Sequence, residues 1–121
     1  MAGDALFIGW GQVARGREQL GLQVFGQAIE YYGKLQQEGR IERFEPFLLG
    51  FHAGDLAGFI IMYGERAKLD EVRADAEFVR LAARANAVVE NLGIVDAFTG
   101  EELGNRMQVF GEIGQEMPQA G

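Results

Sequence analysis

The chain has 121 residues, of which 48% are hydrophobic and 24% are charged, a composition typical of one soluble globular domain. Its formal net charge of −7 offers no basic surface to a phosphate backbone, and its lack of cysteine excludes disulfides and thiolate chemistry. Its first residues have neither a basic start nor a long apolar run, so we expect no secretory signal, and no apolar run approaches the about 20 residues that cross a membrane. We therefore expect a cytoplasmic protein without nucleic-acid or membrane partners, with one domain over residues 1–121 and a frayed tail over residues 115–121.

Hydrophobic periodicity predicts a strand and then a helix at the start of the chain. Residues 5–13 are a short apolar run rich in strand-forming side chains. Residues 17–38 follow a helical period, and their apolar arc covers about half of the helix, more than the ~100° that a surface helix needs. The additional apolar positions lie along one flank: Leu22, Phe25, Ile29 and Tyr32. This helix is predicted to lie on a sheet and to touch something else at its flank.

The middle of the chain predicts a hairpin of unusually apolar strands. Residues 41–52 and 56–64 are strand-like, and Ala53-Gly54-Asp55 supplies the turn between them. Pro46 cannot donate to a ladder, which favours a sheet edge or a bulge for the first of these strands. Within them, Phe47-Leu48-Leu49-Gly50-Phe51 and Phe59-Ile60-Ile61-Met62-Tyr63 have almost no solvent-facing side, so both faces of the sheet need a cover.

Two helices, a strand and a last helix are predicted in the second half of the chain. Residues 67–73 and 75–85 have helical patterns separated by a kink, and the aspartate that opens the second is a good N-cap. Residues 88–98 could continue that helix, but their glycine and β-branched residues favour a strand. Thr99 and Glu102 match a capping box that opens the last helix.

The order strand, helix, strand, strand, helix, strand predicts a four-stranded antiparallel sheet with its helices on one face. This is the ferredoxin-like α+β arrangement, here with an added C-terminal helix. The other face would expose an apolar patch larger than the few hundred Å² that a monomer tolerates. That face holds one alternation of each strand, either the set with Leu6, Ile8 and Trp10 or the set with Phe7 and Val13. Pairing two such faces about a twofold axis removes the patch, so we expect a homodimer.

Two segments add to this element order: Gly58-Phe59-Ile60-Ile61-Met62-Tyr63-Gly64, which leads into a helix, and Asp75-Ala76-Glu77-Phe78, which opens the next. In these features the chain, from Ala5 to about Phe98, resembles the dimeric α+β barrel superfamily. The resemblance implies that two ferredoxin-like sheets pair into one barrel. Members include antibiotic-biosynthesis-type monooxygenases, muconolactone isomerases and haem-degrading enzymes, with their sites between sheet and helices or inside the barrel. Because one fold supports several reactions, the resemblance does not choose among them.

Gly9-Trp10-Gly11-Gln12-Val13-Ala14 matches the dinucleotide-binding pattern G-x-G-x-x-[GA]. That pattern needs a helix N-terminus beside it, an acidic residue about 20 residues on at the end of the next strand, and a parallel sheet. Here the helical period begins only near Arg17, and positions 29–33 fall within it. We favour a structural role, in which Gly9 and Gly11 let a helix or a ligand approach the strand closely.

His52 is the only histidine and the only side chain whose unperturbed pKa lies near neutrality. A loop histidine paired locally with Asp55 is the favoured interpretation, and a general base or a haem ligand is the alternative. One histidine and no cysteine leave only carboxylate oxygens for a metal ion, so we expect no metal site.

Charged residues set into apolar strands are the other candidates. Arg43 and Glu45 share a strand face with Phe47, where they either line a ligand cavity or mark the solvated rim of the barrel. Asp96 interrupts another apolar strand, and an inward carboxylate there would have a raised pKa and could act as a base. The predicted site residues lie on or beside the strands: catalytic His52, Glu45 and Asp96, and ligand-binding Trp10, Arg43 and Tyr63.

The leading hypothesis is a homodimeric barrel protein that binds a small apolar or aromatic organic molecule. Cofactor-independent acid–base or oxygenase chemistry would fit such a site, and no cofactor is expected. The alternative is a non-enzymatic dimeric accessory or interaction protein with a filled barrel, so the sequence leaves open whether the protein is an enzyme. A cavity lined by one of the predicted site residues would favour ligand chemistry.

Overall fold

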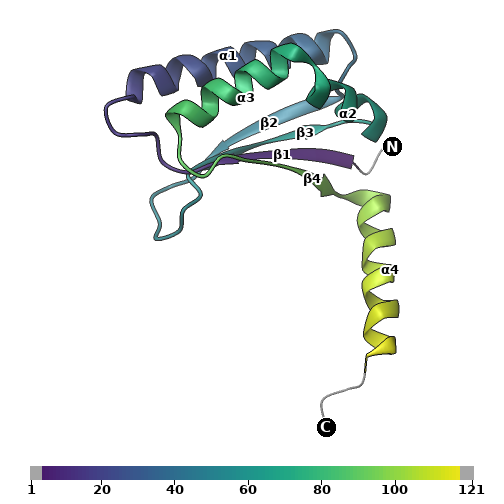
Figure 1. Ribbon diagram of the computed structural model, residues 1–121. Coiled ribbons are helices and arrows are strands. Elements are labelled where there is room, and N and C mark those ends of the chain that lie inside the picture. The colour runs from purple at the N-terminus through teal and green to yellow at the C-terminus, as the bar shows by residue number, and fades with distance from the viewer. Residues whose placement is uncertain (1–3, 118–121) are drawn as a thin grey trace.

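A computed structural model describes residues 4–117 as a layer of helices on one face of a four-stranded antiparallel sheet (Figure 1). The elements in chain order are β1 (Asp4–Trp10), α1 (Glu18–Gln37), β2 (Arg43–Leu48), β3 (Gly58–Tyr63), α2 (Arg66–Ala74), α3 (Ala76–Val88), β4 (Gly93–Phe98) and α4 (Gly100–Glu116). The strands lie in the order β2-β3-β1-β4, and each neighbouring pair is antiparallel. The predicted ferredoxin-like fold class with an added C-terminal helix is confirmed.

The antiparallel sheet removes the dinucleotide-binding interpretation of the glycine motif. Both neighbours of β1 run antiparallel to it, whereas that interpretation needs a parallel neighbour. Gly11 instead serves a close backbone approach. A Cβ atom at this position would lie 2.9 Å from the Glu90 carbonyl oxygen and 3.0 Å from that of Asp55.

The core lies between the sheet and the helices because the strand register sends one alternation of side chains to that side. Leu6 pairs with Met62 and Ile8 with Ile60, and all four side chains are buried. Burying a side chain of this size contributes about 1.5–3 kcal/mol to folding. Residues from every helix of this layer complete the core, among them Val24, Leu35, Leu69, Val72, Phe78 and Leu81.

The opposite face of the sheet has no cover within the described chain. It carries the other alternation of the strands: Phe7, Phe47, Phe59, Ile61, Tyr63 and Val95, with Arg43 and Glu45 on β2. The Phe59 ring stacks on both of its neighbours, with centroids 5.4 Å from Phe7 and 4.7 Å from Phe47. Of the two alternations that the sequence left open, the one containing Phe7 therefore forms the open face.

Several element boundaries differ from those predicted. Residues 88–92 are not strand, because α3 continues to Val88 and the chain then turns through Asn91 at φ 56° before β4. Val13 lies outside β1 and forms an isolated bridge with Val89. The hairpin between β2 and β3 has a longer loop than predicted, over residues 49–57.

Of the two predicted helix N-caps, one forms its capping hydrogen bond and the other does not. Asp75 is the N-cap of α3, where its carboxylate accepts from the backbone N–H of Glu77 at 3.5 Å, and it separates α2 from α3 as the kink predicted. Thr99 occupies the N-cap position of α4, but its side chain makes no capping hydrogen bond, so the capping box does not form. Pro46 lies on the edge strand β2, as predicted.

Helix α4 leaves the end of β4 and projects away from the helix layer, on the side of the open sheet face (Figure 1). None of its residues is buried. Gln115 and Glu116 of the predicted frayed tail belong to this helix, and residues 118–121 lie outside the described residues. Across residues 4–117, no helix has both the length and the apolar character to cross a membrane.

Candidate functional site: a cavity between sheet and helices

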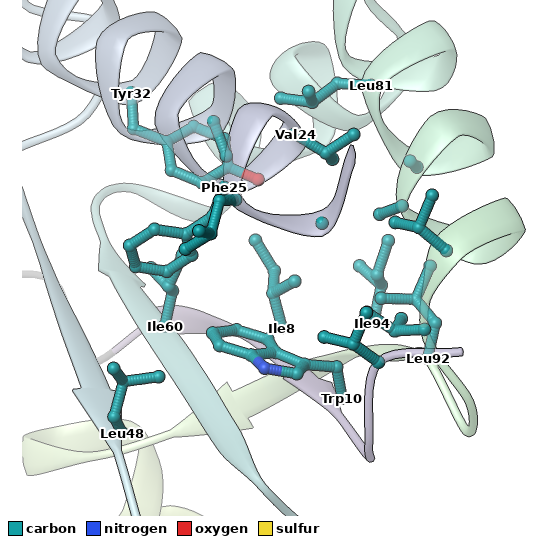
Figure 2. A pocket seen from close by; sticks show the side chains of 18 of the residues that line it. Ile8, Trp10, Val24, Phe25, Tyr32, Leu48, Ile60, Leu81, Leu92 and Ile94 are labelled. Atoms are coloured by element: carbon teal, nitrogen blue, oxygen red, sulfur yellow. The ribbon is translucent and has the colours of Figure 1, made fainter. Parts of the chain in front are cut away.

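A cavity of about 470 Å³ lies between the helix-facing side of the sheet and helices α1 and α3 (Figure 2). This volume falls in the range of small-molecule sites, about 300–1,000 Å³. Its wall is almost entirely apolar, and the main contributors are Ile8 and Ile60 from the sheet, Val24 and Phe25 from α1, and Leu81 and Ala85 from α3. Small side chains on the two helices, including Ala28, Ala82 and Ala85, line the cavity and leave its space unfilled.

Two hydrogen-bonding side chains, Trp10 and Tyr32, lie on opposite sides of this cavity (Figure 2). The Trp10 indole packs edge-on against Phe25, with centroids 5.9 Å apart, and the Tyr32 ring packs edge-on against Phe44 at 5.8 Å. These contacts fix both rings. Burial, and then the neighbouring Tyr31, raises the pKa of the Tyr32 phenol above its usual range, so at neutral pH Tyr32 is a hydrogen-bond donor.

The mouth of the cavity lies where its wall is most exposed. Leu22 on α1 and Leu48 at the end of β2 both line the cavity, yet they are 73% and 75% exposed. Glu18, in the first turn of α1, also lines the cavity and accepts a hydrogen bond from the Gly16 backbone N–H at 3.1 Å. Glu18 is the single acidic group on the described wall, so it is the group there that could accept a proton from a ligand.

Of the six predicted site residues, Trp10 lies in this cavity and three others meet on the open sheet face. The Arg43 guanidinium lies 3.9 Å from the centroid of the Tyr63 ring, and its Nη1 is 3.6 Å from Glu45 Oε1. Because the sheet separates these residues from the cavity, they cannot touch a ligand bound there. They would face the interior of a barrel formed by two sheets.

His52 lies in the exposed loop between β2 and β3, and both of its ring nitrogens are occupied locally. Its Nε2 is 2.6 Å from the Leu56 carbonyl oxygen, and its Nδ1 accepts from the Gly54 backbone N–H at 2.9 Å. Such partners fit a neutral imidazole with its proton on Nε2. The histidine is satisfied within the loop, as expected, but by backbone groups rather than by Asp55.

Asp96 connects β4 to α2. Its Oδ1 lies 2.9 Å from Nη1 of Arg66 and 3.2 Å from Nη1 of Arg73, and Arg66 also pairs with Asp4 at 3.3 Å. The carboxylate is half-exposed and engaged by two guanidinium groups. The structure therefore places the six predicted residues in four separate regions rather than in one site.

Two residues of the cavity were not predicted as site residues. Tyr32 belongs to the apolar flank of the first helix, and the width of that flank was the available signal: Leu22, Phe25 and Tyr32 all line the cavity. Glu18 had no sequence signal, because an acidic residue in the first turn of a helix is common for electrostatic reasons alone.

The sequence matches no protein-family model and no curated protein. Among solved structures, the chain is similar to a dimeric protein of unknown function and ferredoxin-like fold from Bacteroides fragilis, with 14% identity and a TM-score of 0.58 over 79% of this chain and 96% of that chain. It is also similar to SnoaB, a cofactor-independent oxygenase from Streptomyces nogalater, with 16% identity and a TM-score of 0.56 over 84% of this chain and 98% of that chain. A variant of SnoaB gives 15% identity and a TM-score of 0.59. At such identities the likeness shows the fold: this chain has the ferredoxin-like α+β fold that the predicted resemblance to the dimeric α+β barrel superfamily implied.

Proposed function

We propose that the protein is a homodimer that binds a small aromatic organic molecule in the cavity between its sheet and helices. The observation that carries this proposal is the cavity itself, which is about 470 Å³ in volume, almost wholly apolar, and bordered by donors on Trp10 and Tyr32. An apolar wall favours a ligand that is mostly hydrocarbon, and two donors on opposite sides orient a planar ligand with oxygen acceptors.

The dimer is supported by the open face of the sheet. An apolar face of four strands is a poor surface for a soluble monomer, and a second copy offers the same face for a twofold contact. The similar structure from Bacteroides fragilis is described as dimeric. In such a dimer Arg43, Glu45 and Tyr63 would lie inside the barrel.

Cofactor-independent oxygenation is the chemistry that we propose for this cavity, with SnoaB as the structural precedent. Without a redox cofactor, the electrons that reduce O₂ must come from the substrate, which therefore has to be a carbon acid whose anion is stabilised. A CH₂ group then becomes C=O, while the second oxygen atom leaves with the two hydrogens as water. One of the two donors, Tyr32 or Trp10, would donate to the enolate oxygen, and Glu18 would accept the proton.

The binding test uses the fact that Trp10 is the only tryptophan in the chain, so intrinsic fluorescence reports on the cavity. Titration with 1,8-dihydroxyanthraquinone, a planar ligand with oxygen acceptors, is expected to quench Trp10 saturably. Ala85→Phe fills the cavity and should weaken this binding at least tenfold, whereas Ala83→Phe, on the exposed side of the same helix, should not. Equal binding by both variants, or quenching no stronger than that of free N-acetyltryptophanamide, would refute the proposed site.

Measurement of oxygen uptake distinguishes an enzyme from a non-enzymatic binding protein. With anthrone, whose ring CH₂ is acidic, the proposed chemistry predicts consumption of one O₂ for each anthraquinone formed, in the presence of a chelator. Glu18→Gln should slow this turnover without weakening binding. Ligand binding without any oxygen uptake above the uncatalysed rate would favour an accessory binding protein.

A further inference from the structure

Helix α4 has two distinct faces. Six of its polar side chains gather on one face: Glu101, Asn105, Gln108, Glu112, Gln115 and Glu116. The opposite face carries a stripe of large apolar side chains, which we call the α4 stripe: Leu103, Met107, Phe110 and Ile113. Phe110 is 66% exposed and Met107 is 58% exposed. A helix with this pattern buries its stripe against something, yet α4 projects away from the other helices (Figure 1) and none of its residues is buried.

Because α4 contains several glycines, its lack of packing contacts matters for its stability. Gly104, Gly111 and Gly114 lie in its interior, where glycine is among the least favourable residues. None has a neighbour within 4 Å of an added Cβ atom, so nothing in its own chain requires these glycines. Isolated helices of up to about 15 residues are marginal in water even when rich in alanine, and each interior glycine lowers helix stability further. The helix therefore needs a surface that its own fold does not supply.

The direction of α4 indicates where that surface lies. The helix starts at the end of the edge strand β4 and runs away from the sheet on its open side (Figure 1). Its first turns are braced in this direction, because the Arg106 guanidinium lies 3.8 Å from the centroid of the Phe98 ring and also pairs with Glu102 at 3.3 Å. If a second copy packed on the open face, α4 would lie beside that copy.

The length of α4 and the area that a dimer interface needs are both compatible with α4 packing on a second copy. Sheets that pack face to face lie about 10 Å apart, and a helix of this length spans about 25 Å, so α4 would pass the partner's sheet and reach its helix layer. A sheet of four six-residue strands covers about 400 Å² in projection. A stable interface buries about 800 Å² of accessible surface on each partner, and one exchanged helix from each copy would add its exposed apolar stripe to the surface that the sheet faces bury.

We propose that α4 is an exchanged arm, whose stripe packs along the edge and the helix layer of a second copy of this chain. This proposal rests on the proposed dimer and adds a second contact surface to it. In this arrangement α4 of each copy packs against the other copy.

The first experiment measures the dimer dissociation constant by sedimentation equilibrium. Met107→Asp combined with Phe110→Asp places two charges in the α4 stripe and should weaken the dimer at least tenfold. Gln108→Asp combined with Gln115→Asp adds the same charge to the polar face of the same helix and should leave the constant unchanged. A stripe variant that dimerises as well as the wild type would overturn the arm and leave the sheet-to-sheet dimer standing, whereas a wild type that stays monomeric would overturn both.

The second experiment locates the stripe directly. A benzophenone amino acid replaces Phe110 in one sample and Gln108 in another, and each is photolysed in a mixture of ¹⁵N-labelled and unlabelled chains. The arm predicts cross-links between differently labelled chains from position 110 and few from position 108. Cross-links confined to single chains, or equal yields from the two positions, would contradict it.

Discussion

At the scale of single residues, the candidate site depends on where each side chain lies relative to the sheet. Trp10 was predicted from the sequence and lines the cavity, whereas Arg43, Glu45 and Tyr63 lie on the other face. Alternation along a strand shows which residues share a face, but it does not show which of the two faces the helices cover. That choice depends on helix packing, so the sequence alone left it open.

A comparison of variants separates the cavity from the residues outside it. Tyr32→Phe removes one donor and should weaken binding of 1,8-dihydroxyanthraquinone about fivefold, the effect of one hydrogen bond. Glu45→Gln, His52→Asn and Asp96→Asn combined should leave binding unchanged, because none of the three lines the cavity. Isothermal titration calorimetry measures the dissociation constant of the ligand for both variants. The catalytic role predicted for these three residues is judged by oxygen uptake with anthrone, and a triple variant with full turnover would refute it.

At the scale of elements, Asp75 connects the end of α1 to the start of α3. Its Oδ2 accepts from Arg40 Nη1 at 2.9 Å and from the Tyr31 hydroxyl at 3.2 Å, while Oδ1 caps α3. The hydrogen bond from Arg40 is the largest cause that holds the pKa of Asp75 below its ordinary value. The cap was predicted from the sequence, but its two partners were not, because they come from a distant helix and the loop after it.

The pH dependence of stability tests this connection. A carboxylate with a lowered pKa in the folded state contributes its full stabilisation above the unfolded pKa, about 4, and loses it as the pH falls through the folded value. Asp75→Asn should therefore lower the midpoint of thermal unfolding by several degrees at pH 7, and the difference from wild type should shrink below pH 4. Asp70→Asn, on exposed α2 surface, is the control and should change little. A difference that stayed constant from pH 7 to pH 2 would contradict the ionic contribution.

Element order was readable from the sequence because the hydrophobic period changes between strands and helices. Element boundaries were harder to predict. Val88 and Val89 have strand propensities, but α3 packs on α1 and continues through Val88. The cavity could be inferred only as an unassigned apolar flank of α1. Its volume depends on how far apart the packed helices and sheet lie and on which small side chains face the gap, which no local pattern specifies.

At the scale of the whole molecule, the strands that are apolar on both faces explain both halves of the proposed function. One face forms the core and the cavity against the helices. The other face is the one that would pair with a second sheet in the proposed dimer. Val95 lies on that second face, where it pairs with Phe7, and it is 53% exposed in a single chain. An aspartate there should leave the monomer folded and prevent the sheets from pairing.

The most direct test is the molar mass by light scattering across a range of concentrations. We predict twice the chain mass of 13.3 kDa for the wild type, one chain mass for Val95→Asp at micromolar concentration, and twice the chain mass for Val79→Asp, a control of equal exposure on α3. A wild type that remains at 13.3 kDa at every concentration, or a Val95→Asp variant that dimerises as the wild type does, would contradict a dimer built on the open face of the sheet.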